Sequence, residues 1–190
     1  LCVDLRPLNK YVERPHHPLR SPRDVVNSIS PTAKWFSTFD AAHGYFQVPL
    51  AEESQSLTCF LTEWGRYAFQ RATMGLISAG DEYNRRSEEA LEGLTGLVKL
   101  VDDICIFSDT YEEHVKAIRQ FLDRCQAHGI TLNADKMKLA RPEVKFAGFL
   151  VGREGIKADP EKLAAIRCFP TPRNLTDLRS FQGLVEQLGN

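Results

Sequence analysis

Three short apolar runs in the middle of the chain each border acidic residues. The run Phe36–Asp40 predicts a β-strand that ends on a carboxylate. The runs Leu97–Val101 and Ile104–Phe107 are separated only by Asp102 and Asp103, a spacing typical of a β-hairpin. Both arms of this hairpin are so apolar that we expect both of its faces to be buried.

Further extended segments are predicted on either side of these runs. Leu57–Leu61 and Arg66–Phe69 predict a second hairpin, and Tyr45–Leu50 favours an extended or helical piece. Additional strands are expected at residues 137–139, 144–151 and 156, with a turn at 152–155. The stretch up to Pro31 is rich in proline, which disfavours helix, so we expect it to be extended or looped.

Four segments have helical patterns. Residues 81–91 have a helix-forming composition, with Ser78 or Asp81 available as N-cap. Thr110 and Glu113 form a capping box for a helix that Gly129 closes. Two more helices start at Asp159-Pro160 and after Asn174. Because helices and strands do not alternate regularly, we predict an α+β fold with an antiparallel sheet and helices packed on one face.

Composition limits the class of protein. The 190 residues are 43% hydrophobic with a formal net charge of −1, which fits one soluble domain or two small subdomains. No apolar run approaches the roughly 20 residues of a membrane span, so no membrane partner is expected. Five cysteines without CxxC spacing indicate reduced thiols rather than a zinc site. The chain begins Leu1-Cys2 rather than with Met, so we expect a piece of a longer polypeptide.

The Asp102-Asp103 pair is the first candidate for chemistry. Aspartate is common in turns because its side chain bonds nearby backbone amides, so the pair alone is more often structural. Crowding carboxylates beside an apolar core is unfavourable, however, unless a cation compensates. If the strand that ends at Asp40 pairs beside the hairpin, the carboxylates converge into a set of oxygen ligands suited to Mg²⁺. Two such ions about 4 Å apart can support in-line phosphoryl transfer.

Several motifs occur along the chain in a familiar order. They are Leu1-Cys2-Val3-Asp4-Leu5-Arg6-Pro7-Leu8-Asn9-Lys10, Phe39-Asp40-Ala41-Ala42-His43-Gly44-Tyr45, Met74-Gly75-Leu76, Leu100-Val101-Asp102-Asp103 and Phe146-Ala147-Gly148-Phe149. In this order they resemble the motifs of reverse transcriptases, and in detail those of the Ty3/Gypsy class of long-terminal-repeat retrotransposons. Each motif alone is a weak signal, but the ordered set is specific and spans essentially the whole chain.

The resemblance implies a polymerase right hand and a role for each motif. Asp40 and Asp102 would bind two Mg²⁺ ions, for which Mn²⁺ can substitute, with Asp103 assisting and the Ala41 carbonyl as a further ligand. Lys136 would act near the triphosphate as general acid or charge stabiliser. The remaining implied residues are Tyr45, Met74 and Gly75 at the nucleotide, Phe146, Ala147, Gly148 and Phe149 in a primer grip, and Arg6, Lys10, Arg66 and Arg71 at template phosphates.

The resemblance also predicts how the chain is divided. Partial fingers would occupy residues 1–35, palm 36–55, a fingers hairpin 56–73, palm again 74–157, and the start of a thumb or connection 158–190. The sequence departs from the family pattern in three places. Tyr or Phe is usual where Leu100 stands, a proline-containing pair is usual where Thr73-Met74 stands, and the helix start at Asp81 lacks the proline that is commoner there. These departures bear on nucleotide preference and rate more than on the three aspartates.

The expected function is DNA synthesis on an RNA or DNA template, from a primer and deoxynucleotide triphosphates. Protease, ribonuclease H and integrase domains would adjoin the chain in a polyprotein, and the expected location is cytoplasmic, within virus-like particles. One alternative is an inactive or host-recruited nucleic-acid-binding remnant. An RNA-dependent RNA polymerase and an α+β domain with merely acidic turns are two others.

Overall fold

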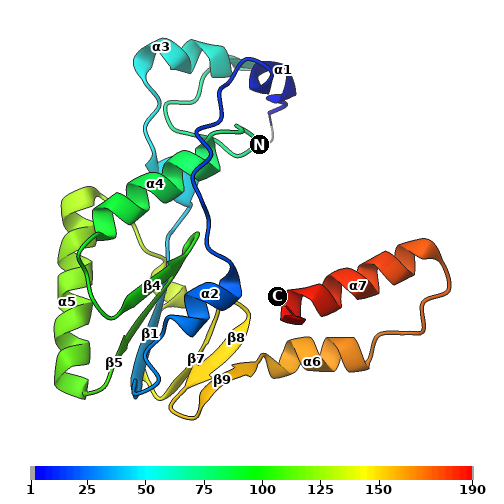
Figure 1. The fold of residues 1–190 in the computed structure, drawn as a ribbon. Coiled ribbons are helices and arrows are strands. Elements are labelled where there is room, and N and C mark those ends of the chain that lie inside the picture. Colours follow the sequence, from blue (N-terminus) through cyan, green and yellow to red (C-terminus); the bar gives the residue numbers. More distant parts are fainter. Residues whose placement is uncertain (1–2, 190) are drawn as a thin grey trace. The chain divides into compact units, whose positions relative to one another are not determined.

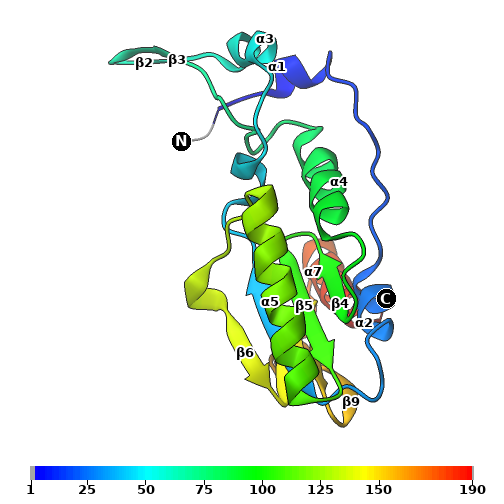
Figure 2. The same ribbon diagram turned by 90° about the vertical axis from the view of Figure 1, so that its left-hand side faces the viewer.

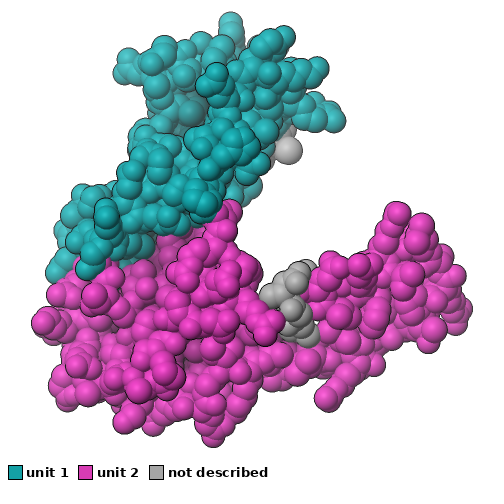
Figure 3. Space-filling view, viewed as in Figure 1, with its two compact units in different colours: residues 1–18, 41–93, 121–132 teal, residues 19–40, 94–120, 133–190 magenta. Residues whose placement is uncertain are grey.

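The computed structural model describes residues 3–189, which fall into two compact units that are discontinuous in sequence (Figure 3). The first unit comprises residues 1–18, 41–93 and 121–132, and the second comprises residues 19–40, 94–120 and 133–190. Leu1 and Cys2, which begin the N-terminal motif, lie outside the described residues. The division into fingers, palm and thumb segments stays a prediction.

The second unit is built on a four-stranded antiparallel sheet in the order β4-β5-β1-β6 (Figure 1). Its strands are β1 (Trp35–Asp40), β4 (Leu97–Leu100), β5 (Asp103–Ser108) and β6 (Lys138–Arg141). The predicted strand and hairpin are therefore confirmed. Strands β1 and β5 pair over six residues, from Trp35 opposite Ser108 to Asp40 opposite Asp103.

Both faces of this sheet are covered. Phe36 on β1 and Cys105 on β5 face a core that includes Val25 and Val26 of α2 (Pro22–Asn27). The same core takes in a second antiparallel sheet, made of β7 (Glu143–Phe146), β8 (Phe149–Gly152) and β9 (Gly155–Ala158). A helix on this face was not predicted, and α2 corrects the expectation of loop before Pro31. Proline at the first helical position needs no N–H partner and is pre-set for helix, which explains the error.

The opposite face packs against residues 111–120 of the long helix α5 (Tyr111–His128), which lies in front of the sheet in Figure 2. The predicted capping box is present: the Glu113 amide donates to Thr110 Oγ1 at 3.3 Å, and the Thr110 amide to Glu113 Oε2 at 3.2 Å. His114 on this helix is fully buried and bonds Ser37 Oγ on β1 at 2.7 Å and Ser108 Oγ on β5 at 3.3 Å. The helix is thereby fixed to the two strands that carry Asp40 and Asp103.

Two helices end the second unit. They are α6 (Pro160–Arg167), which Asp159 caps by accepting from the Glu161 amide at 3.0 Å, and α7 (Leu175–Gly189), where Asn174 accepts from the Asp177 amide at 2.9 Å. Both predicted helix starts are confirmed. Phe169 and Phe181 pack together, with ring centroids 5.4 Å apart.

The first unit contains shorter elements around one longer helix. Its elements are α1 (Arg6–Asn9), η1 (Gly44–Gln47), α3 (Glu52–Gln55), η2 (Ser56–Thr58), β2 (Phe60–Thr62), β3 (Gly65–Tyr67) and α4 (Ala79–Leu91). Strands β2 and β3 form the second predicted hairpin, but the strand expected from Leu57 begins only at Phe60, because residues 56–58 are helical (η2). Helix α4 contains the predicted helix. Ser78 occupies the N-cap of α4 but its side chain makes no capping hydrogen bond.

The α+β class and the antiparallel sheets are confirmed. The four cysteines in the described part of the chain carry free thiols, as expected. No helix among residues 3–189 is long and apolar enough to cross a membrane.

Candidate active site

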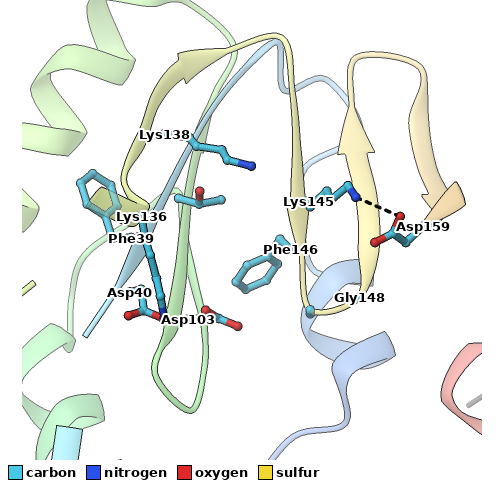
Figure 4. A pocket seen from close by; sticks show the side chains of 11 residues that line it. Phe39, Asp40, Asp103, Lys136, Lys138, Lys145, Phe146, Gly148 and Asp159 are labelled. Atoms are coloured by element: carbon cyan, nitrogen blue, oxygen red, sulfur yellow. Dashed lines mark hydrogen bonds and ion pairs between the residues drawn. The ribbon is translucent and has the colours of Figure 1, made fainter. Parts of the chain in front are cut away.

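Asp40 and Asp103 are brought together by strand register. They are the last pair of the β1–β5 ladder, directly opposite each other. Opposite residues in antiparallel strands have Cβ atoms about 5 Å apart and point to the same face. Figure 4 shows both carboxylates at one end of a pocket in the second unit. Two residues 63 positions apart in sequence (103 − 40) therefore present their carboxylates side by side.

Asp102 lies in the turn between β4 and β5. The turn consists of Val101 and Asp102, one residue earlier than the sequence suggested, because Asp103 is already paired in β5. Val101 has φ 53°, a left-handed conformation that is rare for a β-branched residue. Asp102 Oδ1 is buried and has no hydrogen-bond partner among the described residues. A buried carboxylate oxygen without a partner is costly unless a ligand completes its surroundings.

Charge repulsion marks the three aspartates as neighbours. Burial raises the pKa of Asp103 above its ordinary value, and the charges of Asp40 and Asp102 raise it further, while Lys136 opposes the shift. Lys136 Nζ donates to Asp40 Oδ2 at 2.9 Å, and this bond raises the pKa of the lysine. Lys136 is therefore protonated at neutral pH and compensates part of the negative charge.

Local structure holds Lys136 near Asp40. The lysine ends the short helix η3 (Ala134–Lys136), which Asn133 caps by accepting from the Asp135 amide at 3.1 Å. The Asn133 amide in turn donates to the Asp40 carbonyl at 2.8 Å. Lys136 therefore lies beside Asp40, while its role near the triphosphate stays a prediction.

The donor set can be tested against a divalent metal. In residues 3–189 no group of three or more His, Cys, Asp or Glu side chains is arranged so that it could hold an ion by itself. The oxygens of Asp40, Asp102 and Asp103 are nevertheless the hard donors that Mg²⁺ prefers, and Mg²⁺ usually binds through one or two carboxylates plus substrate phosphates. The unpartnered Asp102 Oδ1 and the mutual repulsion fit a bound cation.

The primer-grip-like hairpin lines the same pocket. The pocket measures about 250 Å³, and Phe146, Ala147 and Gly148 form part of its wall across from Asp40 and Asp103 (Figure 4). Phe146 pairs with Phe149, so Ala147 and Gly148 form a two-residue turn. Their φ angles of 52° and 84° are those of the tight hairpin turn in which both central residues have positive φ. Phe149 itself packs partly into the core of the second unit.

The residues assigned to the nucleotide lie in the first unit. Tyr45 is half-buried and packs edge-on against Tyr83, with ring centroids 5.8 Å apart. Met74 is 63% exposed. Gly75 has φ 91°, which favours glycine, and its carbonyl accepts from Asn9 Nδ2 at 2.7 Å. Ala41 is buried and forms a bridge with Leu132. Their roles stay predictions.

The four basic residues assigned to template phosphates are all exposed. Arg6 is bound to Asp4 at 2.7 Å, and Arg71 donates to the Gln47 carbonyl at 3.3 Å. Lys10 and Arg66 form no ion pair with described residues. Arg66 lies on β3, beside the exposed Tyr67.

Comparison with known proteins decides the family. The family model described as reverse transcriptase (RNA-dependent DNA polymerase) matches residues 1–151. The chain belongs to the reverse transcriptase family. It is 32% identical over 187 residues to the retrovirus-related Pol polyprotein from transposon gypsy of Drosophila melanogaster, and equally so to that from transposon opus. This confirms the resemblance to the gypsy class.

Solved reverse transcriptases have the same fold. A foamy viral protease-reverse transcriptase in complex with an RNA/DNA hybrid superposes with a TM-score of 0.86 at 26% identity, over 96% of this chain and 25% of that chain. A foamy viral enzyme in complex with double-stranded DNA gives a TM-score of 0.90 at 26% identity, over 96% of this chain and 32% of that one. The match to the gypsy polyprotein covers 97% of this chain but only 18% of that polyprotein.

Several residues of the same pocket were not predicted from the sequence. Lys138, Lys145 and Asp159 line the pocket, and Lys145 pairs with Asp159 at 3.3 Å. A signal existed for Lys138, because it lies in the strand expected at residues 137–139, directly after the segment that contains Lys136. Asp159 was read only as a helix cap, a role that it also performs.

Proposed function

We propose that this chain is the polymerase core of an RNA-directed DNA polymerase that copies an RNA or DNA template from a primer and deoxynucleotide triphosphates. The observation that carries the proposal is the pairing of Asp40 with Asp103 beside the buried, unpartnered oxygen of Asp102. Family membership over residues 1–151 and the likeness to enzymes solved with RNA/DNA hybrid and double-stranded DNA support it.

The reaction that this site suits is nucleotidyl transfer. The primer 3′-hydroxyl loses its proton to water and its oxygen attacks the α-phosphorus, so that a new P–O bond forms. The bond from that phosphorus to the oxygen bridging to the β-phosphate breaks, and pyrophosphate leaves. Asp40 and Asp102 would hold two Mg²⁺ ions, with Asp103 assisting. Bound Mg²⁺ would supply activation of the hydroxyl and neutralisation of charge on the phosphates. Lys136, which is protonated at neutral pH, would give a proton or a positive charge to the departing pyrophosphate.

The proposal extends to the neighbours of the chain. Because its relatives are Pol polyproteins of which it covers 18%, we propose that protease, ribonuclease H and integrase segments adjoin it. Tyr45, Met74 and Gly75 would contact the nucleotide, and Arg6, Lys10, Arg66 and Arg71 the template. A location in cytoplasmic virus-like particles stays a prediction.

Primer extension tests the reaction. The chain with its natural flanking segments should extend a primer on an RNA template with Mg²⁺ or Mn²⁺, and Asp40→Asn or Asp102→Asn should reduce product below detection. Asp123→Asn is the matched control, since Asp123 is exposed on α5 and makes no ion pair in the described part of the chain. Circular dichroism should show each variant folded.

Each alternative function predicts a different result in these assays. Tight binding of primer and template without extension by the wild-type chain would favour an inactive remnant. Preference for ribonucleotides would favour an RNA polymerase. Full activity in Asp102→Asn would refute the metal site.

A further inference from the structure

Three lysines line the pocket that holds Asp40 and Asp103, and two of them are already paired. Lys136 binds Asp40 at 2.9 Å, and Lys145 binds Glu161 at 2.7 Å and Asp159 at 3.3 Å. Lys138 forms no ion pair with any described residue. The pocket therefore contains a cation whose charge the protein leaves available to a ligand.

The position of Lys138 follows from strand pairing. Lys138 lies opposite Thr38 in the β1–β6 ladder, and Thr38 is two residues before Asp40 on the same face of β1. Figure 4 shows the Lys138 side chain directed into the pocket, on the side away from the carboxylates. One wall of the pocket is thus acidic at one end and basic at the other.

A second available ammonium covers the turn of the primer-grip-like hairpin. A Cβ added at Gly148 would collide with Lys162 Nζ and would lie 3.3 Å from its Cε. The φ of 84° favours glycine at position 148, and the absence of a side chain there leaves room for the ammonium of Lys162 of α6 against the turn. Lys162 forms no ion pair within 4 Å among the described residues, although its charge helps to lower the pKa of Asp159, which Lys145 already pairs. It lies beyond residues 1–151, the part that the family model matches.

The charge pattern selects the ligand. A molecule that fits must bring an anion to Lys138 and Lys162 while its reacting end lies at Asp40 and Asp103. A nucleic-acid strand that ends at the carboxylates does this, because its backbone carries a phosphate at every nucleotide. A free nucleotide triphosphate is the weaker candidate, since Lys136 is the cation already placed beside the carboxylates.

We propose that Lys138, at the end of the pocket away from the carboxylates, and Lys162, against the Ala147-Gly148 turn, bind backbone phosphates of the primer strand near its 3′ end. This inference rests on the proposed function and assigns two positioning residues to it. Each lysine neutralises phosphate charge and releases counterions, so together they hold the 3′-hydroxyl at the carboxylates.

Binding of a primer–template duplex without nucleotide separates this inference from the reaction itself. Lys138→Ala and Lys162→Ala should each lower the slope of log affinity against log salt by about 0.9, equivalent to roughly eightfold weaker binding at 0.1 M salt. Lys116→Ala is the matched control, because Lys116 is an exposed lysine of α5 without an ion pair in the described chain. Lys162→Arg should retain binding.

Neutral phosphate analogues identify the strand. A methylphosphonate at one of the last three primer linkages should weaken wild-type binding but cause little further loss in the matching lysine variant. The same substitution in the template should weaken all variants alike. Coupling to the template, or a raised KM for the nucleotide with unchanged duplex affinity, would overturn the inference.

These experiments distinguish a failure of the lysine–phosphate contacts from a failure of the proposed polymerase reaction. If the lysine variants bind duplex with unchanged affinity and salt dependence while the wild-type chain extends primers, only this inference falls. If the wild-type chain binds duplex through these lysines but never extends, the proposed reaction falls and the phosphate contacts remain.

Discussion

Replacing Asp103 by asparagine tests the electrostatics of the site without any catalytic assay. Asp103 lies opposite Asp40 and near Asp102, and its raised pKa reports burial and repulsion by both. Asparagine has the same shape without the charge. We therefore expect Asp103→Asn to stabilise the chain at neutral pH in the absence of divalent metal, although it removes a residue of the proposed active site.

The magnitude follows from the geometry. Two unit charges about 5 Å apart in surroundings with an effective dielectric constant of about 20 repel by roughly 3 kcal/mol. Partial burial contributes to the raised pKa of Asp103, but by surface area the residue is exposed, and Lys136 attracts it. Screening therefore reduces the expected gain to about 1 kcal/mol. For a chain of this length, that corresponds to a rise in Tm of about 2–4 °C.

Thermal unfolding in EDTA measures this gain, with Asp123→Asn as control. A group whose pKa is raised in the folded state stabilises the fold fully below its unfolded pKa, here 3.8, and loses that contribution as pH rises through the folded pKa. The difference between Asp103→Asn and wild type should therefore be present at pH 7 and vanish below about pH 4. An unchanged or lower Tm at pH 7 would refute the repulsion.

Two further predictions concern other parts of the chain. His114→Ala removes a fully buried ring and its bonds to Ser37 and Ser108, so urea denaturation should show a loss of about 2–4 kcal/mol. Burial lowers the pKa of His114. Its contribution to the free energy of unfolding is therefore present above the unfolded pKa of 6.5 and is lost as pH falls through the folded pKa. If the stability of His114→Ala depended on pH as the wild type's does, this explanation would be contradicted. Tyr45→Val should increase ribonucleotide incorporation relative to deoxyribonucleotide, and identical discrimination would remove Tyr45 from the nucleotide site.

The convergence of Asp40 with the Asp102-Asp103 hairpin could be predicted because each apolar run ends on a carboxylate and apolar runs of that length form buried strands. The exact turn could not, because Val101 adopts a positive φ that a β-branched residue rarely takes. The turn lies one residue earlier than predicted, so Asp103 belongs to the β5 ladder instead of the turn. That shift is what places its carboxylate opposite Asp40.

Long-range polar contacts could not be predicted from the sequence, for a different reason. His114 lies on the buried face of α5, but a polar residue there is recognisable only when its partners on β1 and β5 are known. Lys162 and Gly148 are 14 positions apart (162 − 148), and a tight turn explains the glycine without any reference to the lysine. Pairings between elements depend on tertiary packing, which local patterns do not encode.

The acidic cluster is held in place by forces that do not depend on its charges. Six paired positions join β1 to β5, an apolar core fills one side, and the buried His114 network fixes the other. Because this framework sets the direction of Asp40 and Asp103, their mutual repulsion is relieved by proton uptake or by a bound cation rather than by movement of the strands. Neutralising one carboxylate should therefore change the affinity for metal and leave the fold intact. The two lysines of the proposed phosphate contacts are also carried by regular elements, Lys138 by strand β6 and Lys162 by helix α6. Neither makes an ion pair within 4 Å in the described chain, so both ammonium groups can bind the proposed phosphates.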